Sequence, residues 1–65
     1  MIKLKIYSNQ SNEIIFQMNI SNELLNEYDI NVNNENFTEL FETEILNDIF
    51  EENNINSSEV YYELK

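Results

Sequence analysis

An amphipathic stretch at residues 36–53 constrains the fold more than any other part of the chain. Its apolar residues recur at steps of three and four, which is the spacing of a helix that buries one side. Asn36 is a favourable N-cap residue, and Glu39, three positions later, can complete a capping box. Asn53 and Asn54 favour a helix end, because Asn tolerates the left-handed backbone conformation. The apolar residues of the stretch are Phe37, Leu40, Phe41, Ile45, Leu46, Ile49 and Phe50.

The apolar residues of this helix fall into two groups that point in different directions. At about 100° per residue, the group before Glu42 and the group after Glu44 centre about 150° apart. One face of a sheet cannot cover both groups. Either a neighbouring helix covers one of them, or the helix breaks near residues 42–44 with Thr43 as a new cap, or a partner protein buries one. We expect cover from within the chain.

Alternating apolar and polar residues predict three strands, at residues 2–7, 13–20 and 59–64. Turn-forming residues from Ser8 to Asn12 separate the first two, so an antiparallel hairpin is expected. Residues 21–28 predict a short helix.

The predicted fold is α+β in a single small acidic domain covering residues 1–65. A three-stranded antiparallel sheet, with strand order 2-1-3, would pack against the main helix, and the connection to the third strand would be right-handed. In the second strand we expect Ile14 and Phe16 to face the core and Ile15 to face away. In the third, alternation turns Tyr61 outward.

Charge is the strongest functional signal in the sequence. The 65 residues include 13 Asp and Glu but only 3 Lys and no Arg, for a net charge of -10, and no base occurs between Glu13 and Glu63. The abundance of Asn and Ile points to A/T-rich codons, which would also supply lysine, so the shortage of lysine indicates selection. Nucleic acid and anionic membranes are disfavoured as direct partners. A basic protein surface is the complementary partner.

The predicted partner-binding surface lies mainly on the main helix. Its carboxylates span about 20 Å at 1.5 Å per residue, which gives one charge per roughly 3–4 Å, close to the charge spacing along one DNA strand. Glu51 and Glu52 oppose the helix dipole, so they have the least structural reason to be there. Tyr61 is added as an exposed aromatic anchor. The alternative is an ordinary solvated face. The predicted binding residues are Glu39, Glu42, Glu44, Asp48, Glu51, Glu52 and Tyr61.

The residue types present argue against catalysis and metal binding. Without His, Cys or Arg, the usual general bases, thiol nucleophiles and guanidinium clamps are missing, so we predict no enzyme and no cofactor. Residues 29–40 begin like a calcium loop, but Asn34 replaces the required glycine and Leu40 the bidentate Glu. No metal site is predicted.

In size, charge and A/T-rich composition the chain resembles the small acidic inhibitors that phages and other mobile elements encode. Those proteins block restriction enzymes, CRISPR nucleases or DNA-repair enzymes. The resemblance implies a cytoplasmic DNA mimic, of the anti-CRISPR or anti-restriction type, that occupies a basic nucleic-acid-binding groove stoichiometrically. The alternative is a generic acidic interaction domain, either an antitoxin-like neutraliser or an assembly subunit. Nothing in the sequence selects between a monomer and an oligomer.

Overall fold

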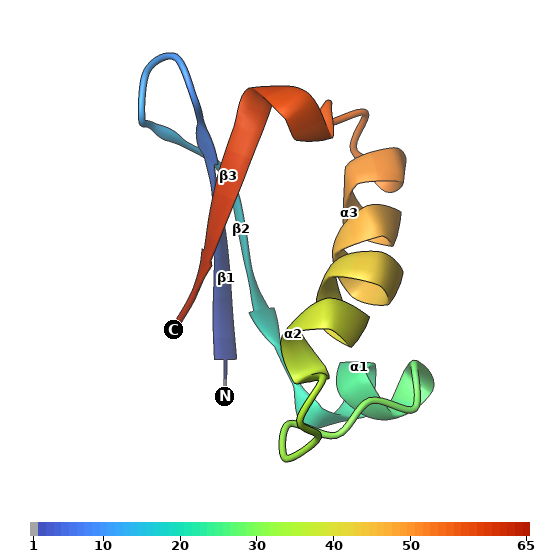
Figure 1. The fold of residues 1–65 in the computed structure, drawn as a ribbon. Coiled ribbons are helices and arrows are strands. Elements are labelled where there is room, and N and C mark those ends of the chain that lie inside the picture. Colours follow the sequence, from blue (N-terminus) through green and yellow to red (C-terminus); the bar gives the residue numbers. More distant parts are fainter. Residues whose placement is uncertain (1) are drawn as a thin grey trace. The chain divides into compact units, whose positions relative to one another are not determined.

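The computed structural model describes residues 2–65 and has an α+β fold (Figure 1). The chain divides into two compact units: a sheet unit, containing residues up to Ser21 and from Asn56 onward, and a helical unit, Asn22–Ile55. The elements in chain order are β1 (Ile2–Ser8), β2 (Ile14–Ile20), α1 (Asn22–Glu27), α2 (Phe37–Leu40), η1 (Phe41–Leu46), α3 (Asn47–Glu52), η2 (Ser57–Glu59) and β3 (Val60–Leu64).

The sheet unit contains the predicted three-stranded sheet, with order β2-β1-β3 and both strand pairs antiparallel (Figure 1). Leu4 of β1 lies opposite Met18 of β2 and Leu64 of β3. Leu4, Ile6 and Ile20 are buried, as the alternation of apolar residues predicts. The even-numbered positions of β1 therefore mark the core face of the sheet, and its odd-numbered positions mark the opposite, open face.

Ser8 closes the hairpin between β1 and β2. Its backbone N–H donates to the Glu13 carbonyl, and its carbonyl accepts from the Asn12 N–H, both at 2.9 Å. The Ser8 hydroxyl oxygen accepts from the N–H groups of Gln10 and Ser11. Asn12 has a φ of 60°, a left-handed conformation that Asn tolerates well. The turn therefore forms without glycine.

A β-bulge changes the predicted facing of β2. Ile6 pairs with Phe16, but the next residue of β1, Tyr7, pairs with Ile14, so Ile15 is an extra residue in the ladder. The prediction that Ile14 faces the core is wrong, because the extra residue shifts the alternation. Ile14 is 44% exposed and Ile15 is 51% exposed. The hairpin end of the open face therefore carries two aliphatic side chains.

The main helix is continuous over residues 37–52, and η1 is a π-helical turn in its middle. The alternative in which the helix breaks and Thr43 caps a new one is wrong. Instead, the Thr43 hydroxyl donates to the Glu39 carbonyl at 3.0 Å and to the Leu40 carbonyl at 3.4 Å. Hydroxyls that bond back to carbonyls in this way perturb regular α-helical geometry.

The π-helical turn brings the two apolar groups of the helix together. A π-bulge adds one residue to a turn, so everything beyond it is turned by about 100° relative to an uninterrupted α-helix. The angle of about 150° between the two groups falls to about 50° on this geometry. The burial agrees, since the buried residues come from both groups. They are Phe41, Ile45, Leu46 and Ile49.

The start of the main helix differs from the prediction. Asn36 makes no side-chain capping bond, so the predicted capping box with Glu39 is wrong. Asn36 has φ -100° and ψ 27°, outside the extended region that aims a cap side chain at the first turn. Backbone bonds close the turn instead: the Phe37 N–H donates to the Asn34 carbonyl at 3.1 Å.

The predicted end of the main helix is confirmed. Asn54 has a φ of 55°, and its N–H donates to the Glu51 carbonyl at 3.4 Å, while the Ile55 N–H donates to Phe50 O at 2.9 Å. This pair of bonds is a Schellman motif, which satisfies the last carbonyls of a helix. Among residues 2–65, no helix has both the length and the apolar character that crossing a membrane requires.

The same motif ends α1. Asp29 has a φ of 56° and donates its N–H to Asn26 O at 3.1 Å, and the Ile30 N–H donates to Leu25 O at 2.9 Å. Leu25 and Ile30 are both buried. The turn thus fixes the direction in which the chain leaves α1.

Candidate acidic interface

The net charge of the chain resides in the helical unit. The sheet unit has three lysines and three carboxylates, so it is neutral, whereas the helical unit has ten carboxylates and no base. The one ion pair within residues 2–65 joins Lys65 Nζ to Glu63 Oε1 at 3.4 Å, inside the sheet unit. No cation within the helical unit neutralises its carboxylates.

The predicted carboxylates of the main helix lie on its exposed side. In an uninterrupted α-helix Glu39 and Glu51 would point about 120° apart, and the π-helical turn reduces this angle to about 20°. A constant helical repeat would therefore separate Glu39 from Glu51, and the added residue of the π-helical turn brings them into nearly the same direction. The exposed members of the row are Glu39, Glu42, Glu44, Glu51 and Glu52.

Asp48 differs from the other carboxylates of the row. It is half-buried, and its Oδ2 accepts a hydrogen bond of 2.7 Å from the hydroxyl of Tyr28, just after α1. This bond, together with burial and the charges of Asp48, Glu52 and Glu27, raises the pKa of Tyr28 to about 12. Asp48 therefore ties two segments of the helical unit together, a role that sequence reasoning missed because its partner lies 20 positions away.

Tyr61 belongs to the sheet unit and is 43% exposed, as strand alternation predicts. Its ring stacks on Tyr7 with centroids 5.0 Å apart and planes at 9°, and its hydroxyl donates to Asn12 Oδ1 at 3.1 Å. The Tyr7 hydroxyl donates to Glu63 Oε1 at 3.2 Å, and burial, followed by this bond, raises the pKa of Tyr7. Tyr61 is thus held in one orientation on the open face.

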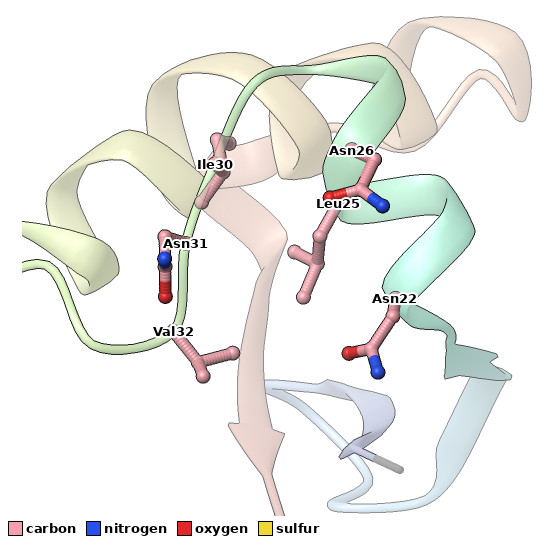
Figure 2. Close-up of a pocket in the computed structure, with 6 residues that line it drawn as sticks. All are labelled: Asn22, Leu25, Asn26, Ile30, Asn31 and Val32. Carbon is pink, nitrogen blue, oxygen red and sulfur yellow. The ribbon is translucent and has the colours of Figure 1, made fainter.

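The helical unit also contains a small hollow of about 160 Å³ (Figure 2). Leu25 of α1 and Val32 of the following loop point into it from different sides (Figure 2). The side-chain oxygen of Asn31 already has a local partner, because Oδ1 accepts a hydrogen bond from the Asn33 N–H at 2.9 Å. The hollow is open to solvent, because four of its six lining residues are exposed. The lining residues, none of them titratable, are Asn22, Leu25, Asn26, Ile30, Asn31 and Val32.

The exposed carboxylates are suited to ionic recognition. They accept charge-assisted hydrogen bonds from Lys and Arg, which is how basic protein surfaces pair with anions. Within the described part of the chain, no three acidic side chains gather closely enough to hold a metal ion. Comparison with family models, curated proteins and solved structures gives no match to this chain.

Proposed function

We propose that this protein is a small acidic inhibitor that occupies the basic, nucleic-acid-binding groove of another protein. It would act in the cytoplasm of a host cell by stoichiometric binding, as a DNA mimic of the anti-CRISPR or anti-restriction type encoded by a phage or mobile element. The observation that carries the proposal is the concentration of the whole net charge in the helical unit, with a row of exposed carboxylates along residues 39–52.

The placement of these carboxylates supports phosphate mimicry over a merely solvated face. Glu51 and Glu52 occupy the last turn of α3, where the helix dipole disfavours negative charge by about 0.3–1 kcal/mol each. Glu39, Glu44, Glu51 and Glu52 have no ion-pair partner among residues 2–65, so no cation of the described chain pairs with their charge. A row about 20 Å long matches roughly six phosphates of one DNA strand.

A second function is favoured by the open face of the sheet unit. That face exposes the side chains of Ile14, Ile15 and Tyr61, and the sheet unit carries no net charge. Exposed aromatic and aliphatic groups of this kind are typical of protein interfaces. The alternative is therefore an acidic interaction domain, antitoxin-like or a subunit of an assembly, that does not mimic nucleic acid.

Competition with nucleic acid distinguishes the two functions. The tagged full-length protein would be used to recover its partner from cells of the natural host, and the complex would then be titrated with duplex DNA and with RNA. An inhibitor of the proposed kind is displaced by one of these nucleic acids, and one copy of it blocks one binding site. Simultaneous binding of the protein and nucleic acid to the recovered partner would contradict the proposal and support the assembly subunit.

A further inference from the structure

Strand β2 is the one helix or strand in the described residues that carries no charged side chain. Its sequence is IIFQMNI, without proline or glycine, and it forms an edge of the sheet. Edge strands of soluble proteins are usually protected by lysine, proline or covering segments, because their free backbone groups pair with other strands. The bulge at Ile15 perturbs only the hairpin end of β2.

The hydrogen bonds of β1 show which backbone groups of β2 face outward. The Lys3 N–H donates to Lys65 O and the Lys65 N–H to Lys3 O, at 2.9 and 3.0 Å, so the backbone groups of Lys3 face β3. Successive residues of a strand direct these groups to opposite sides. The groups of Leu4 therefore face β2, where its partner is Met18.

Gln17 and Asn19 consequently direct their backbone groups away from β1. They lie opposite Lys5 and Lys3, whose own backbone groups face β3. Both side chains are exposed. The described residues provide no further backbone partner for either Gln17 or Asn19. An extended strand can therefore dock at this edge.

We propose that β2 pairs antiparallel with β2 of a second copy of this chain, joining two sheets into one of six strands. A two-fold axis brings the strand against itself, and the register that places Gln17 opposite Asn19 of the other copy satisfies the outward backbone groups of both residues. The same register sets the two side-chain amides opposite each other, where they can exchange hydrogen bonds.

The lack of charge on β2 favours a second copy of the chain over a basic partner as the strand that pairs with this edge. A basic segment would form no ionic contact with β2, because the strand has no carboxylate. Two copies with a net charge of -10 each repel one another. Because β2 is uncharged, pairing through this strand places no carboxylates opposite each other in the pairing strands. Salt screens the remaining repulsion, so dimerisation should tighten between about 50 mM and about 500 mM NaCl.

The test is sedimentation equilibrium of the full chain at these two salt concentrations, with amide hydrogen exchange measured on the same samples. A dimer is expected whose dissociation constant falls at the higher salt concentration. The Gln17 and Asn19 amides should become protected as protein concentration rises, whereas the Phe16 and Met18 amides are protected throughout. A monomer at millimolar protein concentration, or a dimer in which the Gln17 and Asn19 amides exchange as fast as in the monomer, would overturn the proposal.

Gln17→Pro and Gln17→Thr form a matched pair of variants. Proline removes an N–H that points away from β1, so no bond of the β1–β2 ladder is lost, whereas threonine keeps the N–H and favours strands. Gln17→Pro should raise the dimer dissociation constant at least tenfold, and Gln17→Thr should leave it within about threefold. Equal dimerisation by both folded variants would contradict the proposal. If circular dichroism shows Gln17→Pro to be unfolded, the hydrogen-exchange result on the natural sequence decides.

Discussion

At the scale of single residues, the hydrogen bond from Tyr28 to Asp48 distinguishes one acidic side chain from the rest. The other predicted carboxylates of the main helix are exposed, whereas Asp48 is half-buried and holds the Tyr28 hydroxyl at 2.7 Å. A carboxylate that binds within its own unit contributes to stability. We therefore assign Asp48 to the support of the helical unit, and the proposed recognition rests on the exposed carboxylates alone.

Replacing Tyr28 by Phe removes the hydroxyl but keeps the ring. We expect the free energy of unfolding to fall by about 1 kcal/mol, less than for a fully buried bond to a charged group, because both side chains are partly solvated. Urea denaturation at neutral pH measures this. Tyr61→Phe, which removes an exposed bond to Asn12, is the control and should change stability less. An unchanged free energy of unfolding in Tyr28→Phe would show that the hydrogen bond to Asp48 contributes nothing to stability.

Alkaline titration tests the same bond. The pKa of Tyr28 is about 12 in the folded chain against 10.0 for free tyrosine, so the folded state holds this proton more tightly. The contribution to stability is therefore complete below pH 10 and is lost as the pH rises toward 12. Absorbance of tyrosinate should show one residue ionising near pH 12, and this step should be absent in Tyr28→Phe. Ionisation of Tyr28 near pH 10.0 would contradict this.

At the scale of elements, regular patterns were predictable from sequence and irregular ones were not. Alternation and turn formers predicted the three strands, the order assumed for them is found, and the predicted main helix at residues 36–53 is found at 37–52. The bulge at Ile15 and the π-helical turn η1 each add a residue, which a constant periodicity cannot represent. Asn36 likewise makes no capping bond because of its backbone angles, which cannot be predicted from the residue type.

The candidate site was predictable in part for the same reason. Exposure of the carboxylates follows from the apolar stripe on the opposite side of the helix, and exposure of Tyr61 follows from strand alternation. The alignment of Glu39 with Glu51 required knowledge of the π-helical turn. The partner of Asp48 and the apolar pair Ile14 and Ile15 depend on tertiary contacts and on the bulge.

Deleting one residue of the main helix tests the π-helical turn. Removing Thr43 converts the turn into regular α-helix, and the apolar residues on both sides keep one common face. Removing the exposed Asn47 instead turns Ile49 and Phe50 by about 100° away from that face. We expect the Thr43 deletion to fold cooperatively, and the Asn47 deletion to lose at least about 2 kcal/mol of stability through lost burial. The reverse order of stability in thermal unfolding would contradict this geometry.

At the scale of the whole molecule, charge is divided between two units. The sheet unit is neutral, and the helical unit carries ten carboxylates without a base, so its charges repel one another in the folded state. Such an arrangement costs stability and provides a strongly negative surface. The proposed function, binding a basic partner, would account for its retention.

Salt should therefore stabilise the protein. Screening weakens repulsion over a Debye length of about 10 Å at 0.1 M salt, so the melting temperature should rise from low to moderate NaCl concentration. Calorimetry across salt concentrations measures this effect. A melting temperature that falls with added NaCl would show that attractive pairs dominate.

The most direct test of the proposed recognition is the affinity of two charge-matched double variants for the recovered target. Glu51→Gln/Glu52→Gln removes two carboxylates from the end of the helical row, and Glu13→Gln/Glu59→Gln removes two exposed ones from the sheet unit. Both leave the same net charge and similar shapes.

The affinity of each variant would be measured at low and at moderate salt, beside the natural sequence. If the helical carboxylates substitute for phosphates, Glu51→Gln/Glu52→Gln should weaken binding by about 1–3 kcal/mol and reduce its salt dependence, while the fold is kept. The sheet-unit variant should bind within about 0.5 kcal/mol of the natural protein. Equal affinities of the two variants at low salt would contradict the proposed acidic interface.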